Sequence, residues 1–309
     1  MDRSTFLSRL KKLRIWSRGD QRAPNKPLLL LHALARIERG QDRVMKFEEV
    51  KEPLEQLLQE FGPTRQQLHP EYPFWRLEND GIWEVEWPRT SLVRERRPRE
   101  PSAAYLLRKG IAAGFKPEVQ ELLESDPVLR RRAVALLLAR CYPSTYHEDI
   151  LATVGLEAEA EWETVERRVR DPTFRPRVLD AWGHRCGVCS FDVTLGTAPL
   201  ALDAAHIRWK EYRGPDVEGN GIALCALHHR LFDRGAFTLV LGADQDADDL
   251  PRIAVSQKAR GDRGMRFALL DFHGLPLEGP REGRHRPAEE HLAWHRKEVF
   301  QGPERPWGG

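Results

Sequence analysis

The chain has 309 residues, of which 40% are hydrophobic and 31% are charged, a composition typical of a soluble globular protein with about two domains. No apolar run approaches the roughly 20 residues that span a bilayer, and the amino-terminal MDRSTFLSRLKKLRIW lacks the apolar segment of a signal peptide. The formal net charge of +2 indicates no partner by itself, so any basic surface that attracts a polyanion must be local.

The first third of the chain predicts helices on either side of a basic loop. Apolar residues recur at helical spacing over three segments, 5–16, 27–40 and 47–61. The loop between the first two carries Arg18, Arg22 and Lys26 and ends at Pro27, a residue that favours the first turn of a helix. Basic groups at a helix N-terminus suit an anion such as phosphate, and a solvated loop explains the same residues equally well.

The next segment, HPEYPFWRLENDGIWEVEW (69–87), is rich in aromatic rings. Its Asn79, Asp80 and Gly81 separate two aromatic runs and predict the turn of a β-hairpin. Aromatic strands usually pack in a core. The lead-in HPEYPF differs, because two prolines fix the backbone there and present rings on a stiff loop that loses little entropy on binding.

Together, RAPNKPLLLLHAL, HPEYPFWRL and DGIWEV resemble the sulfur-binding domain of phosphorothioate-dependent restriction endonucleases. The resemblance implies a domain that recognises DNA in which sulfur replaces a non-bridging phosphate oxygen. Sulfur is larger, softer and less well hydrated than oxygen, so a pocket of proline and aromatic rings favours it. The resemblance places the sulfur against Tyr72 and Pro73, while basic groups hold the charged backbone. The candidate sulfur- and DNA-binding residues are Arg18, Arg22, Lys26, Pro27, His69, Tyr72, Pro73 and Phe74.

The chain from residue 89 to residue 170 is less informative. Residues 89–99 are basic and broken by proline, which is typical of a solvated loop and also suits an arm that contacts phosphate. Helices are predicted over residues 103–114, 117–123 and 126–140, and we expect Cys141 to lie in the core. Residues 142–149 predict a polar aromatic loop that adds weakly to a DNA-binding face, and residues 157–170 predict a charged helical connector.

Three of the four cysteines fall in two metal-ligand pairs. Cys186 and Cys189 form the first pair, and Cys225 and His228 form the second. Two such pairs predict one tetrahedral zinc with four protein ligands, which makes the site structural rather than catalytic. This use of cysteine also indicates a reducing cytoplasm rather than a disulfide scaffold.

His206, Asn220 and His229 follow in that order within the frame of these two pairs, and the stretch resembles the HNH nuclease motif. The resemblance implies that His206 is the general base on a hairpin, and that His229, assisted by Asp203, holds a divalent cation such as Mg²⁺ or Mn²⁺. Asn220 is expected to brace its loop and to orient His206 through its amide. Commoner members of the family carry an acidic residue where this chain has Ala205, which leaves the second protein ligand of the cation open.

The remainder of the chain predicts strands at FTLVL (237–241) and RFALLDF (266–272) and a closing helix over residues 287–300. We expect His291 and His295 of that helix to pack rather than to bind metal. The predicted fold is α+β, with a mainly helical N-terminal domain that contains a β-hairpin, followed by a zinc-containing ββα-metal nuclease domain. The predicted division is a sulfur-binding domain over 1–155, a connector over 156–170, an HNH endonuclease domain over 171–302 and a frayed tail over 303–309.

Three functions fit this sequence. The first is a modification-dependent, type IV-like restriction endonuclease that binds phosphorothioate-modified double-stranded DNA and cuts nearby. The second is an HNH endonuclease that reads another mark or a plain sequence, and the third is a zinc-stabilised DNA-binding module without catalysis. The intact His206, Asn220 and His229 argue against the third. One such centre per chain would cut both strands either as a homodimer or by two independent nicks.

Overall fold

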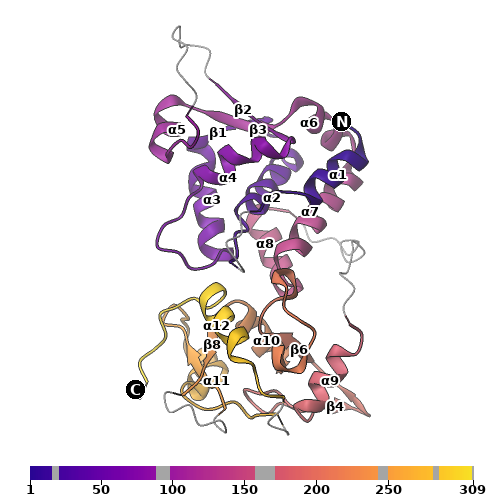
Figure 1. Cartoon of the computed structure of the whole chain (residues 1–309), viewed down its shortest axis with the longest axis vertical. Coiled ribbons are helices and arrows are strands. Elements are labelled where there is room, and N and C mark those ends of the chain that lie inside the picture. Colours follow the sequence, from indigo (N-terminus) through magenta and orange to yellow (C-terminus); the bar gives the residue numbers. More distant parts are fainter. Residues whose placement is uncertain (16–20, 88–97, 157–170, 243–249, 281–284, 308–309) are drawn as a thin grey trace. The chain divides into compact units, whose positions relative to one another are not determined.

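The computed structural model describes residues 1–15, 21–87, 98–156, 171–242, 250–280 and 285–307. The chain divides into two compact units, Met1–Arg167 and Arg168–Gly309, and each mixes helices with short strands, which confirms the α+β class (Figure 1). Among the helices of the described ranges, none combines the length and the apolar character that crossing a membrane requires. The predicted connector over 157–170 and most of the basic segment over 89–99 lie outside the described residues.

The first unit surrounds one buried helix with other helices and a small sheet. Its helices are α1 (Arg3–Lys11), α2 (Asn25–Glu38), α3 (Phe47–Phe61), α4 (Glu71–Arg76), α5 (Ala103–Lys109), α6 (Pro117–Ser125), α7 (Pro127–Cys141) and α8 (His147–Val154). The strands β1 (Val44–Lys46), β3 (Ala112–Phe115) and β2 (Trp83–Glu86) form an antiparallel sheet in that order. The four leucines that follow Pro27 are fully buried, because α2 packs against α3, α4 and α7 at once.

Helix boundaries in this unit follow local signals. The helix predicted over 47–61 is confirmed as α3. The start of α7 is fixed by Asp126, whose carboxylate accepts a hydrogen bond of 3.0 Å from the backbone N–H of Leu129, and Pro127 occupies the first turn. Gly110 ends α5 with a φ of 58°, a left-handed conformation that glycine adopts without strain.

The predicted β-hairpin around Asn79 is wrong. Residues 71–76 form α4, because Pro70 and Pro73 fall at its first turn, where the missing N–H groups need no partner. A 3₁₀ turn over Leu77–Asp80 then ends at Gly81, whose φ of 78° reverses the chain into β2. The partner of β2 is β3, which comes from a segment predicted as helix, so the pairing was invisible to local patterns.

The predicted aromatic loop over 142–149 is also wrong. It contains a 3₁₀ turn (Ser144–Tyr146) and the start of α8. Tyr142 and Tyr146 are buried and their ring centroids lie 5.5 Å apart, so both rings belong to the core rather than to a DNA-binding face.

The second unit contains a ββα arrangement followed by a second strand pair. Its elements are α9 (Phe174–Ala181), β4 (Thr194–Leu195), β5 (Ala198–Pro199), β6 (Leu202–His206), β7 (Gly221–Cys225), α10 (Ala226–Asp233), β8 (Phe237–Val240), β9 (Arg252–Val255), α11 (Arg263–Ala268) and α12 (Glu289–Glu298). Strands β6 and β7 pair antiparallel, with His206 opposite Gly221, and α10 begins directly after β7. Helix α9 packs on both strands and fills the core beneath them.

Two predictions in this unit need correction. Strand β8 is confirmed, but the predicted strand over 266–272 forms α11 and a 3₁₀ turn (Leu270–Phe272), and β9 is the partner of β8. Within the predicted tail, residues 303–307 are held in place, since Arg305 N–H donates to the Val255 carbonyl at 2.8 Å and Trp307 stacks on His273. The closing helix is confirmed as α12, where buried His295 stacks on Phe232 with centroids 3.8 Å apart.

Candidate active site and nucleic-acid interface

Four ligand atoms from two chain segments converge at the start of α10. The sulfurs of Cys186, Cys189 and Cys225 and a ring nitrogen of His228 all lie within 4.8 Å of one another. A tetrahedral zinc bound at about 2.3 Å to each sulfur separates its sulfurs by about 3.8 Å. The Cys189–Cys225 sulfur distance is 4.0 Å, and the Cys186 sulfur lies 3.6 Å from His228 Nδ1, so this arrangement fits one metal ion.

Neighbouring hydrogen bonds prepare His228 for this role. The His228 Nε2 atom lies 2.9 Å from the Ala268 carbonyl oxygen, which can only accept, so Nε2 carries the proton and Nδ1 presents its lone pair to the sulfurs. The backbone N–H of Gly187 donates to the Ala223 carbonyl at 2.8 Å and fastens the Cys186–Cys189 turn to β7.

Electrostatics of the cluster also favour a cation. Burial lowers the pKa of His228, but hydrogen bonds and charge from Cys189 and Cys225 outweigh it and raise this pKa to about 9. Hydrogen bonding to Cys189 raises the pKa of the Cys186 thiol, whereas hydrogen bonding from Cys186 lowers the pKa of Cys225. Thiolate charge is thus favoured at Cys225, while Cys186 and His228 hold protons that a metal ion displaces when it binds.

His206 stands at the end of β6 with its ring held from two sides. Its ring stacks on Phe174 of α9, with centroids 4.1 Å apart and an interplanar angle of 15°. Its Nε2 atom lies 2.8 Å from Asp216 Oδ1, and the side chain is 14% exposed. The imidazole is therefore oriented and still within reach of a substrate.

Asp216 is a site residue that sequence reasoning missed. It lies in the loop between β6 and β7, where its carboxylate accepts hydrogen bonds from Lys210 and, at 3.3 Å, from the backbone N–H of Asp171. Burial raises the pKa of Asp216, but hydrogen bonds from Lys210 and His206 outweigh it and hold this pKa below its ordinary value. The sequence signal was the one aspartate between His206 and Asn220, a position from which a short loop could bring a carboxylate back to the base.

Asn220 is fully buried and braces the same loop. Its Oδ1 accepts from the Arg208 N–H at 2.8 Å, and its Nδ2 donates to the carbonyls of Arg208 and Pro215, both at 3.0 Å. The side-chain amide thus fixes the backbone on either side of the loop, and through it the position of Asp216. The contacts seen for the amide are with the backbone rather than with the His206 ring.

His229 lies on α10 between two carboxylates. Its Nδ1 atom is 3.4 Å from Asp203 Oδ2 on β6, and its Nε2 atom is 3.3 Å from Asp233 Oδ2. Two ligands bound to one cation at about 2.1 Å lie roughly 3 Å apart, so Asp203 and His229 are spaced to share a cation. Asp233, one helical turn after His229 and buried, takes the place of the carboxylate that often orients a metal-binding histidine.

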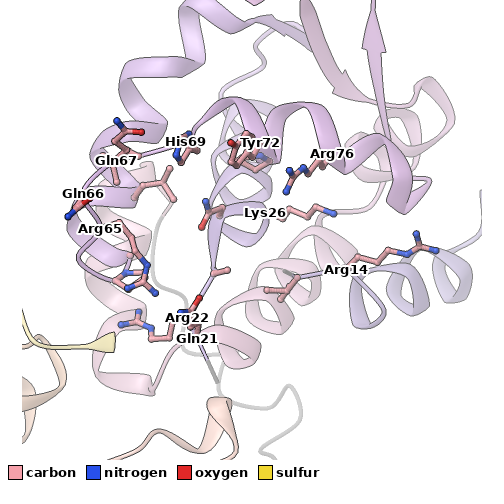
Figure 2. A pocket seen from close by; sticks show the side chains of 18 of the residues that line it. Arg14, Gln21, Arg22, Lys26, Arg65, Gln66, Gln67, His69, Tyr72 and Arg76 are labelled. Carbon is pink, nitrogen blue, oxygen red and sulfur yellow. The ribbon is translucent and has the colours of Figure 1, made fainter. Parts of the chain in front are cut away.

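In the first unit, a groove of about 1000 Å³ opens beside α4. Figure 2 shows the polar and charged side chains that border it. Tyr72 is held in the wall between two neighbours: His69 stacks on one side with centroids 4.5 Å apart, and the Arg76 guanidinium lies 4.4 Å from the ring centroid. Pro73 lines the groove next to Tyr72.

The groove changes the roles expected for several residues. Arg22 is 2% exposed and donates to the Phe61 carbonyl at 2.9 Å, so it is a fixed part of the groove wall. Lys26 Nζ lies 2.5 Å from Asp80, which neutralises its charge. Phe74 and Pro27 are buried and lie outside the groove lining, and Arg18 lies outside the described residues. Basic and amide side chains that the sequence did not single out line the groove beside Arg22 and Lys26: Arg14, Gln21, Arg65, Gln66, Gln67 and Arg76.

Comparison with known proteins gives two family matches. Residues 3–159, about half of the chain, match the family described as ScoMcrA-like, DNA sulfur-binding domain, and residues 186–240 match HNH endonuclease. Both resemblances drawn from the sequence are confirmed. Among curated proteins, no sequence matches the chain.

Solved structures similar to the chain concern the same kinds of protein. The sulfur binding domain of ScoMcrA complexed with phosphorothioated DNA is 26% identical, with a TM-score of 0.41, and the match covers 49% of this chain and 95% of that one. The corresponding domain of SprMcrA, also complexed with phosphorothioated DNA, is 21% identical, with a TM-score of 0.43 and coverage of 50% and 95%. The type IV phosphorothioation-dependent restriction endonuclease ScoMcrA is 26% identical, with a TM-score of 0.42 and coverage of 54% and 31%.

Proposed function

We propose, from the premise that the chain belongs to the family of ScoMcrA-like DNA sulfur-binding domains, that it binds phosphorothioate-modified double-stranded DNA and hydrolyses phosphodiester bonds nearby. The chain joins a DNA sulfur-binding domain to an HNH endonuclease domain. The observation that carries the proposal is this pairing, with His206, Asn220 and His229 gathered on the β6–β7–α10 arrangement of the second domain.

Sulfur recognition is assigned to Tyr72 and Pro73. The ring of Tyr72 is fixed between His69 and Arg76 before any ligand arrives, so binding costs little side-chain entropy. A phosphate oxygen brought against these rings loses water without gaining a hydrogen bond, whereas the weakly hydrated sulfur loses less. The arginines at the groove rim supply attraction for the DNA backbone regardless of sulfur.

Hydrolysis is assigned to the second domain. His206 takes the proton from the attacking water, and Asp203 and His229 would hold a divalent cation such as Mg²⁺ or Mn²⁺. When bound, that cation supplies positive charge to the phosphate and to the leaving 3′ oxygen. We assign the Cys186–Cys189–Cys225–His228 cluster to a structural zinc, because all four positions of the tetrahedron are filled by protein atoms. The same reduced cysteines support a cytoplasmic location.

The direct test compares matched normal and phosphorothioate duplexes incubated with the full chain and Mg²⁺ or Mn²⁺. We expect cleavage of the phosphorothioate duplex and little cleavage of its normal counterpart. Equal cleavage of both duplexes would assign the chain to nucleases that read another mark or a plain sequence. Binding without cleavage under any divalent cation would leave only a DNA-binding role.

Replacement of Tyr72 by Ala is expected to remove most of the preference for phosphorothioate over normal DNA, because the apolar wall that rejects a hydrated oxygen is lost. The ratio of the two dissociation constants, measured at two salt concentrations, should approach one while the salt dependence stays unchanged, since the lost contact is apolar. Tyr105→Ala, at a tyrosine outside the groove lining, is the matched control and should keep the preference.

Replacement of Arg14 or Arg65 by Gln is expected to weaken binding to both duplexes alike. Each variant should lower the slope of log K against log salt by about one unit if the arginine neutralises one phosphate. Arg22→Gln is the informative comparison. Because Arg22 is buried, its replacement should lower the thermal stability of the first unit rather than the salt slope. Unchanged salt slopes in both the Arg14 and the Arg65 variants would show that the groove is not part of the DNA-binding surface.

A further inference from the structure

The loop between β6 and β7 brings one carboxylate to the general base. Asp216 Oδ1 lies 2.8 Å from His206 Nε2, and both side chains are largely buried, with 12% and 14% of their surfaces exposed. Such a contact strengthens as water is excluded. Neither the zinc cluster nor the Asp203–His229 pair uses Asp216, so its position calls for a separate role.

The direction of this hydrogen bond selects one tautomer of His206. An ionised carboxylate only accepts, so Nε2 must carry the proton and Nδ1 becomes the nitrogen that takes up another. We propose that Asp216 is a positioning residue of the nuclease, which fixes the ring and the tautomer of His206 so that Nδ1 receives the proton of the attacking water. This inference rests on the proposed hydrolysis by the HNH domain.

The surroundings of Asp216 keep it in the form that this role requires. Lys210 and the backbone N–H of Asp171 donate to Oδ2, which leaves Oδ1 to His206. Arg177 donates at 2.6 Å to the Asp216 backbone carbonyl and forms ion pairs with Asp171 and Glu218, so the loop is anchored to α9 as well. Phe174, from the same helix, blocks one face of the His206 ring. The ring can neither flip nor tilt without losing these contacts.

Asp216 also contributes to hydrolysis after His206 has taken up the proton of the attacking water. Water attacks phosphorus and gives its proton to His206 Nδ1 as the new P–O bond forms, and the bond from phosphorus to the 3′ oxygen breaks with its electron pair on that oxygen. The 3′ oxygen then takes a proton from solvent, and His206 returns its proton to solvent. While His206 is an imidazolium, the Asp216 carboxylate stabilises its charge.

The test measures single-turnover cleavage by the full chain at saturating protein, on whichever duplex the wild type cuts. Asp216→Asn preserves shape but offers both a donor and an acceptor, so the His206 tautomer is no longer fixed. We expect the cleavage rate to fall roughly 10- to 100-fold, which is a part of the about 10²–10⁴-fold that a general base contributes. The dissociation constant for DNA, the zinc content and the Tm should stay near the wild-type values.

Asp192→Asn is the matched control, because it makes the same acid-to-amide change at an exposed position of the same unit. If Asp216 acts through His206, this control should stay within about threefold of the wild-type rate at saturation. An equal loss in both variants would show that the loss does not come through His206 and would overturn the proposal, as would an Asp216→Asn variant that cuts at the wild-type rate.

A readout without substrate separates this inference from the proposed function. In histidine-¹⁵N-labelled full chain, His206 should give the shifts of the Nε2-protonated tautomer, and Asp216→Asn should shift that population. If no duplex is cut, the proposed function fails while the tautomer measurement still decides the Asp216 assignment. Should Asp216→Asn fail to fold, Asp216→Glu keeps the charge and should retain the tautomer, and a His206 tautomer protonated at Nδ1 in wild type would refute the inference.

Discussion

Replacement of His206 by Asn is expected to abolish DNA cleavage while leaving DNA binding and zinc content nearly intact. The imidazole is the proposed proton acceptor for water, and a general base contributes about 10²–10⁴-fold to the rate. Binding should survive because the groove lies in the first unit. Zinc should stay because its four ligands do not include His206. Single-turnover cleavage, DNA titration and metal analysis on one preparation test all three statements.

The matched control is His184→Asn. His184 lies in the same unit, the hydrogen bond described for its side chain is with the exposed Asp180, and its φ of 55° is one that asparagine tolerates. It should cut at the wild-type rate. Cleavage by His206→Asn near that rate would remove His206 from the role of base, and a parallel loss of zinc would show that the variant damages the fold instead.

Replacement of Cys225 by Ser is expected to remove the zinc and to unfold the second unit. A closed structural site contributes its binding free energy to folding, roughly 10 kcal/mol for zinc-dependent peptides at neutral pH. This cluster ties the Cys186–Cys189 turn to the end of β7 and the start of α10, which carries His229. Cleavage should disappear with the metal, whereas binding to phosphorothioate DNA should remain, since the groove belongs to the first unit.

Cys141→Ser provides the comparison for this variant. Cys141 is buried in the first unit and is not part of the metal cluster, so its replacement should leave zinc content and the unfolding of the second unit unchanged. Metal analysis together with calorimetry of the full chain distinguishes the two cysteines. Retention of zinc and of both unfolding transitions in Cys225→Ser would show that the cluster is not a structural metal site.

Sulfur recognition and DNA cleavage are assigned to different units of this chain. Sulfur preference depends on desolvation against the Tyr72 ring, and hydrolysis depends on proton transfer at His206. Because these two events use different chemistry on different units, single substitutions should separate recognition from cleavage.

The amino-acid sequence alone predicted the cluster of potential metal ligands and identified the nuclease motif. Two pairs of ligands, each with two residues between its members, need only a tight turn and a helix start to face one ion, so local geometry carries most of that information. It also determined α3, α7 and β8, because apolar periodicity and capping residues act within a few positions along the chain.

Which side chains line the groove and which contact His206 became clear from the three-dimensional fold. Strand β2 pairs with β3 rather than with the adjacent residues 74–77, which are helical, since hydrogen-bonding partners in a sheet need not be close in sequence. The sequence predicts that Arg22 and Lys26 hold the DNA backbone, yet a backbone carbonyl and Asp80 accept hydrogen bonds from them, and Arg14, Arg65 and Arg76 also line the groove. Asp216 reaches His206 because Asn220 folds the intervening loop back onto β6, and that contact depends on backbone hydrogen bonds that no residue pattern specifies.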